Sequence, residues 1–421
     1  MQHEFETKDD LNKSTTVAFW TNFSISILAC LIIFIFRHQI ATIVGNPGLG
    51  NSISVASLLI IIAAFSSIQM ARYKRNFDFK TLFFVRIGSS LMPLIITIPL
   101  AVWLRNYWAL LIGTFARHLF NAMVLTWKSE WKPTFYYSFK RLKEMFSFTA
   151  WTLLESISIW LTTNIGVFIV GTFLHEYYLG LYKTTMSTIN AYMAIITSAI
   201  TPVMFSALSR YQNDESLFKK TFYTFQKLTA LFVFPMGVGI YLFSDLVTEI
   251  LLGEQWLEAS GFIGLWGLTS AITIVFSNFS SEVYRSKGNP KLSLFSQLLH
   301  LVFLIPVLII SARHGFQVLY ITRSIIRLQM VITAIILLQA IYKLKFADTL
   351  KNVLPAIVAT VIMGCVGYFL MQFNNGMLWQ FSAIFICIIV YFISLFLLFP
   401  SVWHKDVKPL LNKALSKIKR D

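Results

Sequence analysis

Twelve long apolar runs constrain this chain more than any other feature of its sequence. Each is about twenty residues long, the length that an α-helix needs to cross the hydrocarbon core of a membrane. Of the 421 residues, 56% are hydrophobic and 13% charged, more continuous apolar sequence than a soluble core can use. The runs predict an all-α polytopic membrane protein with spans at about 17–36, 53–71, 82–102, 107–127, 146–173, 179–205, 222–243, 258–281, 293–312, 318–341, 353–372 and 379–399.

The basic residues support this number of spans independently of hydropathy. In multi-pass membrane proteins Lys and Arg collect in the cytoplasmic loops. One alternating set of segments between the runs holds 26 of them, whereas the other set holds only Arg37, Arg105 and Arg313. This asymmetry predicts an even number of spans with both termini in the cytoplasm. It also accounts for the net charge of +16, so nucleic acid is not an expected partner.

Signals of catalysis and metal binding are not found in the sequence. Cys30, Cys365 and Cys387 all lie inside apolar runs, where they form neither a disulfide framework nor a metal-ligand spacing. Nucleotide-binding loops and nucleophile elbows are also missing. We therefore expect no enzyme activity, no catalytic residue, no metal and no cofactor. Residues 1–16 carry acidic side chains and no apolar core, so they predict no signal peptide.

An internal repeat predicts two related halves. Residues 43–46 (IVGN) and 251–254 (LLGE) each precede an apolar helix, a short basic loop and a second helix that contains a proline, Pro99 or Pro306. The two copies have the same orientation, because an even number of spans separates them. The second half then begins near Phe146, and the two spans that follow Phe146 have no counterpart at the start of the chain.

Six short motifs, taken in order, suggest a family. They are FWTN at 19–22, IVGNP at 43–47, RYKRNFDFK at 72–80, LGLY at 179–182, PVMFSALSR at 202–210 and LLGEQW at 251–256. Together they resemble the Wzx-type oligosaccharide flippases, in the polysaccharide transporter branch of the superfamily that also holds the multidrug and toxin extruders. The resemblance covers nearly all of the chain up to about residue 340.

The resemblance implies a domain organisation. Family members have two six-helix bundles around a central cavity and two additional C-terminal helices. They usually begin with two further helices, which we expect this chain to lack, and residues 2–16 look like the loop that follows them. The expected domains are therefore a four-span half-bundle at 1–145, a six-helix bundle at 146–345, and two additional spans with a basic cytoplasmic tail at 346–421.

One departure from the family pattern concerns charged residues. Family members often carry Asn-x-Asp-Arg in the first helix of the second half. Here Asn164 is kept, while Gly166 and Val167 stand at the Asp and Arg positions. Any role of that charged pair cannot be carried over to this chain.

Ionisable side chains inside the spans are the candidates for a site, because they are costly in a membrane and tend to face an interior or a watery cavity. They are Arg86, Arg117, Lys183, Lys227, Arg323, Arg327 and a single well-buried carboxylate, Glu155. Arg86, Lys183 and Lys227 lie near span ends, from which their stems can snorkel to water. Arg117 lies in mid-span, and Arg323 and Arg327 share one helix face because they are four residues apart. Pairing with backbone carbonyls or with Glu155 is the structural alternative.

An excess of buried positive charge suits an anionic cargo, since Arg binds diphosphate through two parallel hydrogen bonds. The resemblance implies that this cargo is a polyprenyl-diphosphate-linked oligosaccharide. Arg86, Arg117, Arg323 and Arg327 are then candidate substrate-binding residues, and Asn164 is a candidate for sugar contacts. Glu155 is a candidate site for proton or sodium coupling, or else it neutralises a neighbouring Arg.

The implied function is a flippase that moves an O-antigen, capsule or exopolysaccharide repeat unit across the bacterial inner membrane by alternating access. Its other expected partners are membrane lipids and the polysaccharide polymerase and export proteins. Three alternatives remain open: a multidrug-type cation antiporter, which favours acidic residues in its cavity; a truncated family member that transports nothing; and a membrane glycosyltransferase or O-antigen polymerase. The last needs a sizeable hydrophilic loop, whereas the longest internal loop, 128–145, is short and basic.

Overall fold

The computed structural model describes residues 7–43, 47–374 and 376–409, and all regular structure in these ranges is helical. Twelve helical segments of the described chain are long and apolar enough to cross a membrane, which confirms the predicted number of spans. By its internal contacts the chain divides into unit 1, residues 1–149, and unit 2, residues 150–421. The predicted subdivision of the second part at residues 345 and 346 stays a prediction.

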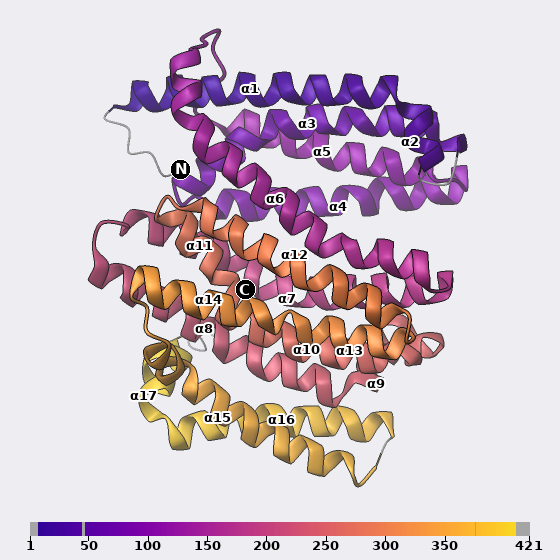
Figure 1. Cartoon of the computed structure of the whole chain (residues 1–421), viewed down its shortest axis with the longest axis vertical. Coiled ribbons are helices and arrows are strands. Elements are labelled where there is room, and N and C mark those ends of the chain that lie inside the picture. Colours follow the sequence, from indigo (N-terminus) through magenta and orange to yellow (C-terminus); the bar gives the residue numbers. More distant parts are fainter. Residues whose placement is uncertain (1–6, 44–46, 375, 410–421) are drawn as a thin grey trace. The chain divides into compact units, whose positions relative to one another are not determined.

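Unit 1 is built mainly from four long helices (Figure 1). Helix α1 packs on α3, and α5 packs on both α3 and α4. Helices α4 and α5 approach closely at Gly113, where an added Cβ atom would lie 1.7 Å from Thr97 Oγ1. The elements of this unit are α1 (Lys8–Ile35), α2 (Arg37–Ile43), η1 (Pro47–Leu49), α3 (Gly50–Arg75), α4 (Phe79–Leu104), α5 (Trp108–Lys128) and the beginning of α6 (Phe139–Phe173).

Polar side chains fix the beginnings of three helices in unit 1. The side chain of Thr7 caps α1, and the Asp78 carboxylate accepts a hydrogen bond of 3.0 Å from the backbone N–H of Thr81 at the beginning of α4. Near the beginning of α6, Arg141 forms an ion pair of 2.5 Å with Asp10 and a hydrogen bond of 3.0 Å with Ser14, both on α1. These contacts join helices that lie far apart in the sequence.

Unit 2 is organised around α10, which contacts α7, α8, α13 and α14. The span that contains α10 is the most deeply buried of the twelve. The elements of this unit are the remainder of α6, α7 (Glu176–Arg210), α8 (Glu215–Leu242), α9 (Ser244–Leu252), η2 (Glu254–Ala259), α10 (Ser260–Thr273), η3 (Ile274–Asn278), α11 (Phe279–Ser286), α12 (Pro290–Ala312), α13 (Phe316–Ile326), α14 (Leu328–Tyr342), α15 (Phe346–Met371), α16 (Met377–Leu398), α17 (Pro400–Val402) and η4 (Trp403–Val407).

Small residues let α8 and α10 approach closely, as in many membrane bundles. A Cβ atom on Gly237 would lie 2.4 Å from the Cβ atom of Ala271, and one on Gly267 would lie 2.6 Å from a methyl group of Ile240. On the other side of α8, the C-terminal helices pack as a pair, with α15 in contact with both α8 and α16. Helix α10 is therefore held tightly on the side that faces α8.

Two of the predicted spans in unit 2 are interrupted. The span predicted at 258–281 consists of α10, a π-helical segment at Ile274–Asn278 (η3), and α11. Two hydrogen bonds link this segment to neighbouring helices: Gln226 on α8 donates to the Val275 carbonyl at 3.1 Å, and Ser277 of the segment donates to the Met330 carbonyl on α14 at 3.3 Å. The span predicted at 318–341 divides at Arg327, between α13 and α14.

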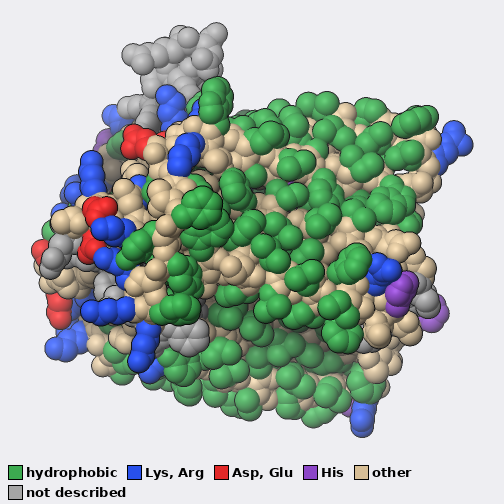
Figure 2. Space-filling view, turned by 90° about the horizontal axis from the view of Figure 1, so that it is seen from above, with side chains coloured by type: hydrophobic (Ala, Val, Ile, Leu, Met, Phe, Trp, Pro, Cys, Tyr) green, Lys and Arg blue, Asp and Glu red, His purple; other side chains and the backbone are tan. Residues whose placement is uncertain are grey.

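The long helices present apolar side chains on their outer faces. On α4, Leu94 is 56% exposed and Val102 is 71% exposed. Hydrophobic side chains dominate the face drawn in Figure 2. Such surfaces are too large and too continuous for water and are those expected of helices that contact lipid.

Candidate functional site

Two arginines lie in the interior of unit 2, at the end of α13. Arg323 is 3% exposed and Arg327 is partly buried. Arg323 donates from Nε to the Tyr182 hydroxyl and from Nη2 to the Thr162 carbonyl, both at 3.2 Å. Arg327 donates from Nη1 to Ser270 Oγ at 2.7 Å. Helices α6, α7 and α10 thus each supply a neutral acceptor to this pair of cations.

A tryptophan on α10 links the two arginines. The guanidinium carbons of Arg323 and Arg327 lie 5.0 Å and 4.0 Å from the centroid of the Trp266 ring. At these distances each cation–π interaction contributes about 0.5–2 kcal/mol. The indole N–H of Trp266 donates to Asn190 Oδ1 on α7 at 3.2 Å. Arg323 and Arg327 were predicted to share one helix face, and both contact the same aromatic ring.

These arginines keep part of their hydrogen-bonding capacity. Within the described ranges, no carboxylate forms an ion pair with Arg323 or Arg327. Their bonds leave Nη1 of Arg323, and Nε and Nη2 of Arg327, without an acceptor among the described residues. A guanidinium has five N–H donors in a planar fork, so the pair can still bind an oxyanion.

A row of polar side chains continues from the arginines along α12 and α14. His300 is fully buried, and its Nδ1 lies 3.0 Å from Gln329 Oε1. Gln329 donates from Nε2 to Thr333 at 2.6 Å. Thr162 is 3.4 Å from Gln297 Oε1 on α12. The interior of unit 2 is therefore polar along several helices.

Glu155, the candidate for ion coupling, is fully buried and forms an ion pair with Arg285. Arg285 donates from Nη2 to Oε1 at 2.7 Å and from Nε to Oε2 at 3.1 Å, which is a bidentate pair. Ser293 on α12 donates to the same carboxylate, and Arg285 also contacts Glu282 at 3.3 Å. A network of α6, α11 and α12 thus neutralises Glu155 in this structure, and its coupling role stays a prediction.

Three further substrate-binding residues were predicted from the sequence: Arg86, Arg117 and Asn164. Arg86 on α4 and Arg117 on α5 belong to unit 1, and both side chains are exposed. Asn164 donates to the Trp160 carbonyl one turn earlier on its own helix, at 2.8 Å. The roles of these three residues in substrate binding stay predictions.

Trp266 and Ser270 were not among the residues predicted from the sequence. Trp266 lies within the span predicted at 258–281, one turn before Ser270. This central position was the available signal, because a mid-span tryptophan has no interface to anchor it. Tyr182 and Asn190 contact Arg323 and Trp266, respectively.

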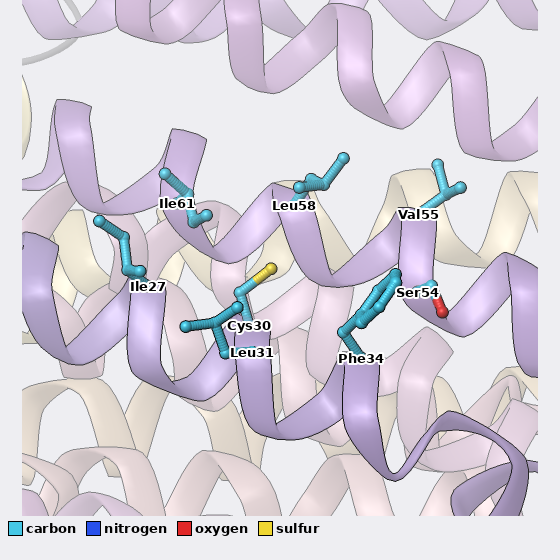
Figure 3. Close-up of a pocket in the computed structure, with 8 residues that line it drawn as sticks. All are labelled: Ile27, Cys30, Leu31, Phe34, Ser54, Val55, Leu58 and Ile61. Carbon is cyan, nitrogen blue, oxygen red and sulfur yellow. The ribbon is translucent and has the colours of Figure 1, made fainter.

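Unit 1 contains an apolar groove between α1 and α3 (Figure 3). Its volume is 390 Å³, and inside it Cys30 Sγ lies 3.1 Å from Ser57 Oγ. Lys and Arg are not among its lining residues, so it is distinct in chemistry from the arginine pair. The groove is lined by Ile27, Cys30, Leu31, Phe34, Ser54, Val55, Leu58 and Ile61.

Comparison with characterised proteins gives relatives of low identity. The chain is 21% identical over 292 residues to the teichuronic acid biosynthesis protein TuaB of Bacillus subtilis, covering 68% of this chain and 60% of TuaB. It is 21% identical over 257 residues to the lipopolysaccharide biosynthesis protein WzxC of Escherichia coli (60% of this chain, 51% of WzxC). The succinoglycan biosynthesis transport protein ExoT of Rhizobium meliloti is 22% identical over 261 residues (62% and 53%). The matches span between about half and three-fifths of these relatives.

Among solved structures, the lipid II flippase MurJ in its inward closed conformation shares the fold. The TM-score is 0.67 at 16% identity, over 94% of this chain and 86% of MurJ. In sequence, residues 2–261 match the model of the family described as polysaccharide biosynthesis protein. These findings confirm the resemblance predicted from the six motifs. Because the match covers more than half of its length, the chain belongs to the polysaccharide biosynthesis protein family.

Proposed function

We propose that this protein is a flippase that moves a lipid-linked oligosaccharide across the bacterial inner membrane by alternating access. The twelve spans, the family membership and the MurJ-like fold support a multi-pass membrane transporter. The names of the relatives WzxC and ExoT point to the assembly of cell-surface polysaccharides. The function proposed for this chain is transport rather than catalysis.

The observation that carries the proposal is a pair of arginines in the interior of unit 2, Arg323 and Arg327, for which the described residues provide no carboxylate partner. A charged side chain within a membrane is costly and is retained where it pairs or binds something. Arg323 and Arg327 bind neutral oxygens and a ring, so their positive charge is not cancelled. A diphosphate offers the opposite charge and the oxygen geometry that guanidinium groups bind best. We therefore propose that the arginine pair binds the diphosphate that joins the lipid to the glycan.

The proposed orientation places both termini in the cytoplasm. It rests on the 26 Lys and Arg residues in one alternating set of segments, against three in the other. A cytoplasmic substrate would then enter from the basic side and leave on the opposite side, where a polymerase and export proteins would receive it. Cysteine-accessibility labelling in intact cells, with single cysteines at Arg313 and Lys343, tests this orientation.

A multidrug-type cation antiporter is the second candidate, since it shares the scaffold. Its cargo would need a free buried carboxylate. In the described part of the spans, the two buried carboxylates, Glu155 and Glu282, are both bound by Arg285. The positive interior of unit 2 therefore favours an anionic cargo.

The test is complementation of a strain whose own gene for this protein is deleted. Arg323→Ala, Arg327→Ala and the double variant should each reduce the surface polysaccharide, and the double variant should abolish it. Arg313→Ala is the matched control, because Arg313 is exposed at the end of α12 and, within the described residues, its side chain contacts only the Phe173 ring. Membrane levels of each variant are compared by immunoblot.

Normal export by the double variant would overturn the role of the arginine pair. Failure of the wild-type gene to restore the polysaccharide would favour the non-transporting alternative. Export of a cationic dye that depends on Glu155 would favour the antiporter.

A further inference from the structure

We propose that Trp266 is a positioning residue that holds Arg323 and Arg327 together as one anion-binding unit. This inference rests on the proposed function and specifies how the anionic part of the cargo would be held. It is drawn from the contacts of the indole ring, which joins two cations on α13 to an amide on α7.

Two guanidinium groups on one helix face repel each other, and the repulsion is stronger in a membrane interior than in water. In most proteins a carboxylate between them would remove this repulsion. A carboxylate would also occupy the N–H donors and cancel the charge that an anionic ligand needs. The pair therefore requires a group that attracts both cations and leaves their donors free.

The face of an indole ring meets this requirement. Its quadrupole is negative on the face, so it attracts a guanidinium without accepting its in-plane hydrogen bonds. Arg327 lies 4.0 Å and Arg323 lies 5.0 Å from the centroid of Trp266, both within the range of about 6 Å for this interaction. Nη1 of Arg323, and Nε and Nη2 of Arg327, keep no acceptor in the described part of the chain.

The ring itself is fixed on two sides. Asn190 accepts from the indole N–H at 3.2 Å, and Phe262 packs edge-to-face on the ring with a centroid distance of 5.8 Å. Trp266 and Phe262 are 2% and 0% exposed. Phe262 in turn packs on Tyr182, whose hydroxyl accepts from Arg323. The orientation of the ring is therefore set before a ligand arrives, and so are the positions of the cations.

The ligand class follows from the free donors. Donors from two neighbouring guanidinium groups fit an anion whose oxygens sit on two centres, which is the geometry of a diphosphate. Arg327 is only partly buried, so one of the two cations has exposed surface. Ser270 lies on α10, the helix that carries Trp266, and accepts a hydrogen bond from Arg327. This bond fixes the second cation beside the ring.

The test measures the binding of inorganic pyrophosphate to the purified full-length protein in nanodiscs by isothermal titration calorimetry. Trp266→Leu should weaken binding about tenfold or more, because Leu fills space but has no ring face. Trp266→Phe should stay within about threefold of the wild type, because it keeps an aromatic face. Both variants lose the hydrogen bond from the indole N–H to Asn190, so that loss cannot account for a difference between them.

Two further variants test the hydrogen bond of the indole and provide a control. Asn190→Ala removes the acceptor of the indole N–H, and because Asn190 is exposed it opens no cavity in the core; it should weaken binding about threefold. Trp379→Leu is the matched control, since Trp379 also donates its indole N–H, to the Leu370 carbonyl at 2.9 Å, and should bind as the wild type does.

The inference is overturned if Trp266→Leu binds like the wild type, if Leu and Phe weaken binding equally, or if the wild type does not bind pyrophosphate. The flippase proposal is judged separately, by the complementation of the arginine variants. Loss of export in those variants together with unchanged pyrophosphate binding by Trp266→Leu would reject the role of Trp266 alone.

Discussion

A Cβ atom built on Gly166 of α6 would lie 2.0 Å from the hydroxyl oxygen of Tyr182 on α7. That hydroxyl accepts a hydrogen bond from Arg323, so the absence of a side chain at residue 166 is what lets the phenol reach the cation. The relationship also explains the departure from the Asn-x-Asp-Arg pattern in physical terms. With Tyr182 in this position, an aspartate at residue 166 would have no space.

Replacement of Gly166 by Ala should therefore destabilise the protein and disturb Arg323. Tyr182 is fully buried, and a contact below 3 Å forces it to move, at a cost of about 1–3 kcal/mol. Thermal unfolding in detergent, together with export in the complementation strain, measures both effects. Gly171→Ala on the same helix is the control: its nearest neighbour would lie at 3.6 Å, so it should be neutral or slightly stabilising. Equal melting temperatures for the two variants would contradict the argument.

The ion pair between Glu155 and Arg285 predicts a different pattern. Glu155→Gln leaves Arg285 with only its weaker contact to Glu282, and breaking a buried pair from one side costs about 3 kcal/mol. Arg285 is 25% exposed, so water will offset part of this loss. The free energy of unfolding in urea, measured in detergent micelles, should fall accordingly.

The double variant Glu155→Gln with Arg285→Gln distinguishes pairing from coupling. It should regain part of the lost stability, because no unpaired charge remains. If Glu155 also carries a coupling proton or sodium ion, export by Glu155→Gln will lose its dependence on that ion. Unchanged export and unchanged ion dependence would remove Glu155 from the coupling mechanism.

A second ion pair holds the segment after α16 to α8. Lys227 Nζ lies 2.5 Å from an oxygen of Asp406, and the two side chains are 22% and 14% exposed. We expect Asp406→Asn to lower stability by about 1–2 kcal/mol, because Lys227 keeps its charge in a partly buried position. Glu215→Gln, which breaks the exposed pair between Glu215 and Lys219 at the beginning of α8, should cost no more than about 0.5 kcal/mol.

Exchange of the two charges, Lys227→Asp with Asp406→Lys, should restore most of the loss. Measurement of the melting temperatures of the single and exchanged variants tests this directly. A charge exchange that is no better than the single variants would show that the pair does not contribute through its charges.

The cap of α4 predicts a pH effect. Hydrogen bonds from the backbone and side chain of Thr81 lower the pKa of Asp78 below its usual value. A carboxyl group whose pKa is lower in the folded state contributes fully above its unfolded pKa of about 4, and its contribution is lost as the pH falls through the folded-state pKa. Protection of the Thr81 amide against hydrogen exchange should therefore fall as the pH is lowered below about 4.

Asp78→Asn is the informative variant, because Asn is as good a cap as Asp and carries no titrating proton. Its protection at Thr81 should not change over the same pH range. Above about pH 4, Asp78→Ala should lose about 1 kcal/mol of local stability relative to the wild type, and the difference should shrink at lower pH. A pH-dependent loss of protection in Asp78→Asn would exclude the carboxylate as the cause.

The number of spans could be predicted because hydropathy is a property of each run by itself. The boundaries were less accurate, since polar residues extend the helices beyond the membrane: α1 begins at Lys8 and α8 at Glu215, each several residues before the predicted span. The break at Ile274–Asn278 was not predicted, because it depends on Gln226 and Ser277 meeting backbone groups across helices.

The site could be predicted only in part, for a related reason. The spacing of Arg323 and Arg327 on one helix is visible in the sequence, but their partners Thr162, Tyr182, Trp266 and Ser270 come from three other helices. The sequence suggested that the side chain of Lys227 extends to water, but in the structure Lys227 forms an ion pair with Asp406, 179 residues later in the chain. Contacts of this kind are set by packing, and neither hydropathy nor periodicity carries information about them.

The π-helical turn at Ile274–Asn278 has one more consequence. A wider turn takes in an additional residue, so the stretch after it is out of phase with the stretch before it. Each residue of an α-helix advances the azimuth by about 100°. Deletion of a single residue from this turn would rotate Arg285 by about a quarter of a turn around the helix axis, away from Glu155. The position of Trp266, which precedes the turn, would not change. The irregular turn thus lets one span direct Trp266 toward the arginine pair and Arg285 toward Glu155.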